Sequence, residues 1–203
     1  LGATALPSSE RDAVAKRMLE QARLEHASVA SFARASLELI ALGAPPDLLR
    51  DTARAMQDEI EHARLCFAIA RAHGAGDAGP GPLDLAGAVP NGVDPARVAY
   101  AVAYEGCVGE TLGAAEAAEE SREAADPVLR EVLARIAEDE QRHAALAWRT
   151  LAWLGATFGP DARVAASRGV DDALRELTGD AASALRRDAA RLVIEPCAAS
   201  LLA

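Results

Sequence analysis

Two pairs of chemically active residues share one spacing. Glu59 is followed three positions later by His62, and Glu140 is followed three positions later by His143. On a helix, residues three apart project from the same side, so each pair could present a carboxylate and an imidazole to one ion. Carboxylate oxygens and imidazole nitrogens are common ligands of divalent metal ions. Both pairs are therefore candidate metal ligands.

Each pair also falls on the apolar side of its predicted helix. The first pair continues a stripe formed by Leu49, Thr52, Met56 and Cys66, and the second continues one formed by Leu129, Leu133, Ile136 and Ala147. A carboxylate within an apolar stripe is costly unless a cation neutralises it. The stripes therefore favour buried metal ligands over exposed helix charges.

A third carboxylate is expected at the depth of the first pair. Glu25 lies on an apolar stripe of the preceding segment, with Met18, Ala22, Val29, Phe32 and Leu39. The midpoint between Glu25 and His62 falls in the turn at Gly43–Pro45. Because an antiparallel hairpin folded there brings the two residues level, we predict that Glu25 is a ligand.

Two glutamates compete for the corresponding place in the second half of the chain. Glu105 and Glu110 both fall level with the second pair if the chain folds back near Ala125. Glu105 ranks first because it lies on an apolar stripe, whereas Glu110 lies about 140° further around an ideal helix. A π-turn, which Gly106 and Gly109 could tolerate, would bring both onto one face. We predict Glu105 as the direct ligand and Glu110 as a second carboxylate or a group that contacts a ligand.

An aspartate precedes each ligand glutamate. Asp58 and Asp139 occupy equivalent places, and each could hydrogen-bond a ligand histidine of the neighbouring helix. A surface role is equally expected from the sequence.

The elements that carry these residues are predicted to be helices. Alanine and leucine dominate and aromatic residues make up 3%, a composition that favours helix. Periodicity predicts helices over about 7–42, 46–73, 94–125 and 126–154, with breaks at 43–46 and 155–160. Two shorter segments follow, near 161–178 and 180–194, and Glu195-Pro196 is expected to end the last of them, leaving a short apolar tail.

Residues 74–93 are rich in glycine and proline and form the one long connection. The expected fold is all-α, with a four-helix bundle of two hairpins and a long crossover over residues 7–155. A C-terminal helical extension over 160–203 should pack on the bundle or at an interface. The two hairpins also look duplicated: residues 46–65 align on 127–146 without a gap, with nine of twenty positions identical.

The complete pattern resembles the ferritin-like di-iron carboxylate superfamily, whose bundles supply a Glu from each of two helices and a Glu-x-x-His from each of the other two. The segments LEHASVASFA, DEIEHARLCFA and EGCVGET also resemble bacterial ferritin-like domain proteins and, more distantly, the di-iron hydroxylases of modified tRNA. The resemblance covers about residues 10–155. It implies two iron ions, or alternatively two manganese ions or a mixed pair, that meet O₂, peroxide or superoxide.

We therefore expect an oxidoreductase that activates O₂ or peroxide toward an unknown small substrate, with His62 and His143 each anchoring one metal. The alternatives are a ferroxidase or storage protein, which requires assembly into a shell or ring, and a di-manganese catalase. A metal-free bundle for partner binding conflicts with the inward acidic stripe, because unneutralised buried carboxylates would have to take up protons.

Composition narrows the remaining classes. A net charge of −10 disfavours binding to nucleic acid or an anionic membrane surface. No apolar run approaches the ~20 residues that cross a bilayer. Three scattered cysteines favour a reducing compartment, so we expect a cytoplasmic protein, which could pair as a homodimer. Because the chain starts at Leu1, we expect its start to be trimmed.

Overall fold

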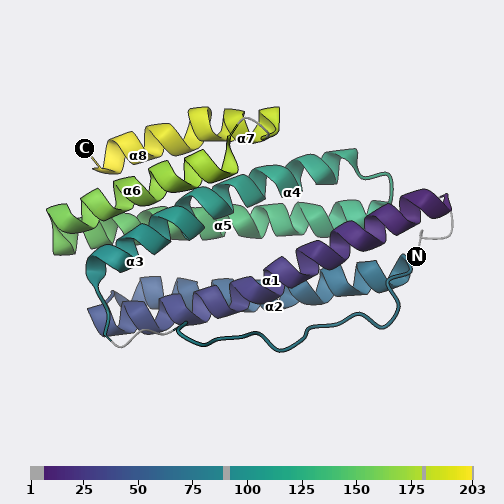
Figure 1. Cartoon of the computed structure of the whole chain (residues 1–203), viewed down its shortest axis with the longest axis horizontal. Coiled ribbons are helices and arrows are strands. Elements are labelled where there is room, and N and C mark those ends of the chain that lie inside the picture. The colour runs from purple at the N-terminus through teal and green to yellow at the C-terminus, as the bar shows by residue number, and fades with distance from the viewer. Residues whose placement is uncertain (1–6, 89–91, 180–181, 203) are drawn as a thin grey trace.

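The structure is a computed structural model that describes residues 7–88, 92–179 and 182–202. Within those ranges the chain forms helices and no strand, which confirms the all-α prediction (Figure 1). In chain order the helices are α1 (Ser8–Leu42), α2 (Pro46–Ala72), α3 (Pro95–Ala101), the π-helix η2 (Val102–Glu110), α4 (Thr111–Glu123), α5 (Pro127–Phe158), α6 (Pro160–Leu177), α7 (Ala184–Ala189), the π-helix η3 (Ala190–Ile194) and α8 (Glu195–Leu202).

Two antiparallel hairpins form the body of the bundle. Helices α1 and α2 pack together along their length, and the continuous run α3–η2–α4 packs in the same way against α5. The turn between α1 and α2 uses Gly43 at φ 74°, a left-handed conformation that costs glycine nothing. The long connection runs beside the first hairpin in Figure 1, and its residues 89–91 lie outside the described ranges.

Local sequence signals set where the second hairpin begins and turns. The Asp94 side chain accepts a hydrogen bond from the Ala96 N–H, and Asp126 accepts from the N–H groups of Val128 and Leu129. A proline follows each aspartate as the first helical residue, where its missing N–H breaks no helical bond. Interpreting Asp126-Pro127 as a helix start is therefore confirmed.

Residues 102–110 form a π-helix inside the predicted third helix. Gly106 lies in it, and a Cβ at this position would be 2.7 Å from the Ala147 Cβ. The absent side chain therefore lets the backbone of η2 approach α5 closely. This wider turn sets the orientation of Glu105 and Glu110, described below.

The C-terminal segments pack on the outer side of the second hairpin, and two predicted helix ends there were wrong. Helix α5 does not end before Gly155 but continues to Phe158, and the Arg163 guanidinium donates to the Gly155 carbonyl. The chain remains helical through Glu195-Pro196 as α8. The π-helix η3 ends two residues before this proline, and a local change of helical register accommodates a residue that lacks an N–H. The predicted start of the last segment at 180–181 lies outside the described ranges.

The buried apolar residues form two main clusters, one toward each end of the bundle. The first unites α1, α2, α4 and α5 through residues that include Met18, Phe67, Leu133 and Ile136. The second unites α3, η2, α5 and α6 through Val98, Val108, Leu151 and Leu154 among others. Across the described ranges, no helix has an apolar stretch long enough to cross a bilayer.

Candidate metal centre

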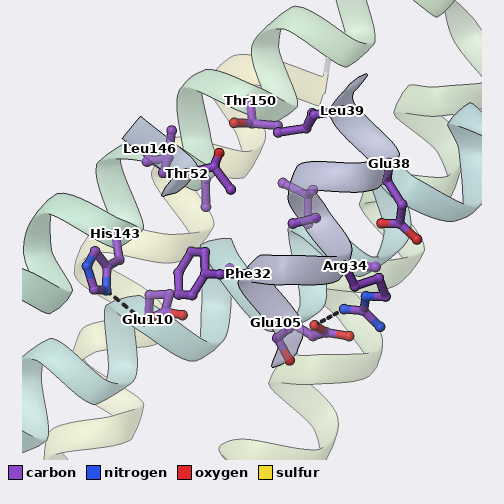
Figure 2. Close-up of a pocket in the computed structure, with 16 residues that line it drawn as sticks. Phe32, Arg34, Glu38, Leu39, Thr52, Glu105, Glu110, His143, Leu146 and Thr150 are labelled. Atoms are coloured by element: carbon purple, nitrogen blue, oxygen red, sulfur yellow. Dashed lines mark hydrogen bonds and ion pairs between the residues drawn. The ribbon is translucent and has the colours of Figure 1, made fainter. Parts of the chain in front are cut away.

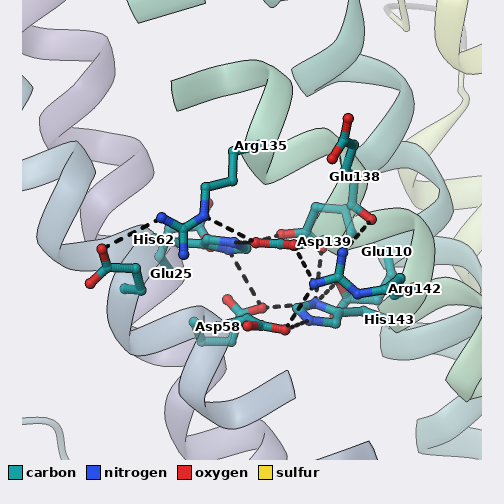
Figure 3. A network of polar contacts seen from close by, with 12 residues as sticks. Glu25, Asp58, His62, Glu110, Arg135, Glu138, Asp139, Arg142 and His143 are labelled. Atoms are coloured by element: carbon teal, nitrogen blue, oxygen red, sulfur yellow. Dashed lines mark hydrogen bonds and ion pairs between the residues drawn. The ribbon is translucent and has the colours of Figure 1, made fainter. Parts of the chain in front are cut away.

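Six ionisable side chains from four helical elements meet in the middle of the bundle (Figure 3). Five of them are at most 6% exposed, and the sixth, Glu110, is half-buried. We refer to them as the six-residue cluster: Glu25 from α1, Glu59 and His62 from α2, Glu110 from the end of η2, and Glu140 and His143 from α5.

The cluster divides into two overlapping groups of four. In each group, one ligand atom from every member lies within 4.8 Å of the others. Glu59 and Glu140 belong to both groups, so two carboxylates are shared between neighbouring positions. The groups are Glu25, Glu59, His62 and Glu140, and Glu59, Glu110, Glu140 and His143. Each position thus has one imidazole, one carboxylate of its own and two shared carboxylates, and could hold a metal ion.

Both histidines direct the same ring nitrogen inward. The His62 Nδ1 atom lies 3.5 Å from a carboxylate oxygen of Glu25 and 3.5 Å from one of Glu140. The His143 Nδ1 atom lies 3.0 Å from Glu59 and 3.5 Å from Glu140. Nδ1 is therefore the atom that each ring offers to an ion.

The opposite nitrogen of each ring contacts an aspartate of the facing helix. His62 Nε2 is 2.9 Å from Asp139, and His143 Nε2 is 3.3 Å from Asp58, so the contacts are reciprocal. A neutral imidazole that donates from Nε2 keeps the Nδ1 lone pair free for a cation. The hypothesis that Asp58 and Asp139 contact the ligand histidines matches this geometry.

Arg142 joins Asp58 and Asp139, a role that the sequence analysis did not predict. Its guanidinium donates to Asp139 and lies 3.4 Å from Asp58. Arg135 adds a longer contact of 3.9 Å to Asp139 (Figure 3). The available signal was the i, i+3 spacing of Asp139 and Arg142, which is usual for a surface ion pair and so did not indicate this link between helices.

Three buried atoms of the cluster form no hydrogen bond of good geometry: Glu59 Oε1, His62 Nδ1 and His143 Nδ1, although Glu59 Oε1 and His143 Nδ1 lie 3.0 Å apart. Leaving a buried polar atom unpaired costs about 1–3 kcal/mol, so such atoms are rare in folded proteins. All three lie at the positions from which they would coordinate a cation. The residues present therefore fit a pair of divalent ions.

Burial, together with the neighbouring charged groups, divides the carboxylates into two kinds. Burial raises the pKa of Glu59 to about 8, with Glu140 and Glu25 adding to the effect, and burial raises the pKa of Glu110 well above its usual range. Burial also opposes ionisation of Glu140, but a hydrogen bond from Glu110 and close contacts with His143 and His62 lower its pKa overall. Without metal, protons therefore take the place of cations at some of the carboxylates.

The histidines are held in their charged form by the same carboxylates. Burial lowers the pKa of His62, but Glu140, Glu25 and Asp139 outweigh it and raise it to about 11. Burial likewise opposes charge on His143, whereas Glu140 and Glu59 raise its pKa to about 10. A cation that binds here has to displace protons from both rings.

Glu110, rather than Glu105, is the η2 carboxylate that joins the cluster. Glu105 is 43% exposed at its side chain and pairs with the Arg34 guanidinium. Both glutamates line the same cavity, as a π-turn predicts for positions i and i+5. They lie at different depths along it, so ranking Glu105 first as the ligand does not agree with the structure. The apolar stripe favoured Glu105 only because it assumed an α-helix.

A cavity of about 80 Å³ adjoins the cluster between α1, α2, η2 and α5 (Figure 2). Glu110 and His143 form part of its wall, and Phe32 contacts the His143 ring edge to face at 5.2 Å between ring centroids. Sequence reasoning placed Phe32 on an inward stripe but did not predict a cavity, because its shape depends on how four elements approach one another.

The other two histidines are bonded away from the cluster. The His26 ring contacts the Gly81 carbonyl oxygen at 3.0 Å, and the His73 ring contacts that of Ile69 at 2.9 Å.

Comparison with known proteins identifies no relative of this chain. The chain matches no protein-family model, no curated protein sequence and no solved structure.

Proposed function

We propose that this protein is a ferritin-like bundle that binds two metal ions, with iron the expected metal, and acts as an oxidoreductase on O₂ or peroxide. The observation that carries the proposal is the pair of overlapping ligand groups with two shared carboxylates. Two hairpins separated by a long connection, with ligands from all four long segments, support the ferritin-like arrangement.

The donor atoms favour iron or manganese. Each group offers one imidazole nitrogen and three carboxylates, a donor set that suits iron and manganese. Zinc and copper(I) sites more often contain thiolates, and neither group contains a cysteine. When bound, such a pair supplies one-electron redox steps and open positions for oxygen or peroxide. Glu59 and Glu140 would be shared between the ions, and Glu25 and Glu110 would each serve one of them.

The chain's own residues orient and insulate this centre. Asp58 and Asp139 contact Nε2 of the ligand rings and so orient Nδ1 toward the position of the metal, and Arg142 holds the two aspartates in turn. The apolar clusters at either end limit the access of water to the carboxylates. The adjoining cavity favours a protein that processes a substrate over one that only stores iron.

Metal content and reactivity with oxygen test the proposal. Metal-free protein is reconstituted anaerobically with Fe(II), and metal per chain is measured by elemental analysis. We expect about two ions per chain, oxygen consumption on exposure to air, and new near-ultraviolet absorption of the oxidised pair. A Glu59→Ala, His143→Ala double variant is the comparison, and the proposal fails if that variant retains as much iron as the native chain.

The same preparation separates the remaining alternatives. Manganese in protein purified from medium containing both metals, together with rapid peroxide disproportionation, would assign a di-manganese catalase. Rapid oxidation of many Fe(II) ions per chain by a large assembly would assign iron storage.

A further inference from the structure

The cavity beside the six-residue cluster reaches only one of its two halves. Glu110 and His143 line it, whereas Glu25 and His62 do not. Figure 2 shows Phe32 between His143 on one side and Arg34 with Glu105 on the other. A molecule in the cavity would therefore meet the position served by Glu110 and His143 first.

The walls of the cavity are mostly apolar. They include Ala35, Leu39, Val102, Leu146 and Ala147. Three hydroxyl-bearing residues, Ser31, Thr52 and Thr150, also line the cavity, and the Thr52 hydroxyl donates to the Leu48 carbonyl at 2.8 Å. Thr52 is therefore already hydrogen-bonded within its own helix, and the walls favour an apolar occupant.

The charged groups at the outer part of the cavity are already paired. Arg34 bonds Glu105 across α1 and η2, and Glu38, which is 2% exposed, accepts from Arg97 at 2.7 Å. Arg34 is the one arginine or lysine among the described residues that line the cavity, and the charged His143 ring is already held by Glu59 and Glu140. An anionic substrate would have to displace Glu105 from Arg34, or the carboxylates of Glu59 and Glu140 from His143, so the arrangement disfavours it.

We infer that the substrate is a small, uncharged, mainly apolar molecule that reaches the Glu110–His143 side of the metal pair through this cavity. The inference rests on the proposed function, because it names the substrate class of the same centre. A dry cavity of ~150 Å³ in another protein holds benzene, so about 80 Å³ accommodates roughly three to four heavy atoms. Phe32, beside the His143 ring, limits the inner end.

The test uses the metal-free full chain with methyl groups labelled for NMR. The probes are xenon, 1-propanol and acetate, the last two having equal numbers of heavy atoms but different charge. We expect xenon and 1-propanol to shift the methyl resonances of Leu39, Val102 and Leu146. Acetate should bind at least about tenfold more weakly than 1-propanol. Tighter binding of acetate, lost on Arg34→Gln, would instead assign an anion site and overturn the inference.

Filling the cavity provides the matched comparison. Ala35→Phe should weaken xenon binding by at least about tenfold, whereas Ala41→Phe, at an exposed position on the same helix, should not. Thr150→Leu fills the cavity from α5, so the test does not depend on one variant folding. Co(II) stoichiometry is measured in parallel for each variant.

Xenon binding and Co(II) stoichiometry distinguish failure of the substrate inference from failure of the proposed function. A filled variant that binds two Co(II) ions and still shows the xenon shifts would overturn the substrate inference and leave the metal centre intact. A native chain that binds xenon but no Co(II) would remove the proposed function, and the substrate assignment with it.

Discussion

Loading the metal-free protein with two equivalents of Co(II) at pH 7 is expected to release about four protons per chain. Burial lowers the pKa of each ligand histidine, but carboxylate contacts outweigh it and raise the value to about 11 for His62 and about 10 for His143. Burial raises the pKa of Glu59 to about 8 and that of Glu110 well above its usual range. His62, His143 and Glu59 therefore carry a proton at pH 7. Glu110 carries the proton of its hydrogen bond to Glu140, whose own pKa is lowered, so all four groups must lose a proton to coordinate.

The exchange leaves the buried charge unchanged, because two divalent ions bring four positive charges and about four protons leave. Linkage then sets the pH dependence: below about pH 8, the overall affinity for two ions should rise about ten-thousandfold per pH unit. Above that pH the affinity should rise only about a thousandfold per pH unit, which corresponds to about three released protons, because Glu59 is then ionised even without metal.

Isothermal titration calorimetry measures the release directly. The apparent heat of Co(II) binding is compared at pH 7 in PIPES and in ACES, whose ionisation enthalpies differ. His26→Gln should leave the release unchanged, since this ring contacts Gly81 and not the cluster. Glu110→Gln should lower it by about one proton. Release of fewer than about two protons by the native chain would refute the electrostatic account of the centre.

Three further outcomes are expected. The raised pKa values of His62 and His143 contribute stability to the metal-free fold that is fully present below the unfolded value of 6.5 and is lost as pH rises toward 10–11. Burial raises the pKa of Glu59 to about 8, so this carboxyl group destabilises the fold increasingly as pH rises from 4.5 to 8. The urea midpoint should therefore fall between pH 6 and pH 9.5, and a rise would contradict the assignment. Asp139→Asn should weaken Co(II) binding about 10–100-fold, measured by competition with a chelator. The effect should exceed that of Asp58→Asn, because the contact of Asp139 with His62 is shorter than that of Asp58 with His143. Native affinity in both variants would show that the aspartates do not support the ligands. Gly106→Ala should lower the free energy of unfolding by about 1–3 kcal/mol, because the added methyl group would contact Ala147, and Tm should fall by about 2–4 °C per kcal/mol. Gly113→Ala is the control and should not lower Tm, because a Cβ there meets no neighbour within 4 Å. An unchanged Tm for Gly106→Ala would mean that η2 and α5 can separate without cost.

Several features followed from local sequence. The helices begin at Asp94-Pro95 and Asp126-Pro127 because a side chain cap and a fixed φ act within a few residues. Helical period placed Glu59, His62, Glu140 and His143 on inward stripes, and the structure brings these four together. The level of Glu25 followed from the turn at Gly43, since rise per residue is constant along both helices.

Other features could not be read locally. Near the end of α5 the Gly155 carbonyl accepts from both the Gly159 N–H and the Arg163 guanidinium, and the helix that contains Pro196 is preceded by η3. Both are settled by contacts or by helical register outside the residue in question. Arg142 gave no signal of its own, because an i, i+3 ion pair looks the same whether or not a second aspartate faces it.

The sequence by itself determined the helices, the two Glu-x-x-His pairs and the burial of their side, because periodicity and residue type are properties of one segment. Only the tertiary structure decided that Glu110 lies in the cluster while Glu105 pairs with Arg34, and that a cavity adjoins one half of the centre. The physical reason is that a change of helical register in η2, permitted where Gly106 meets Ala147, rotates side chains by amounts that segment periodicity does not encode.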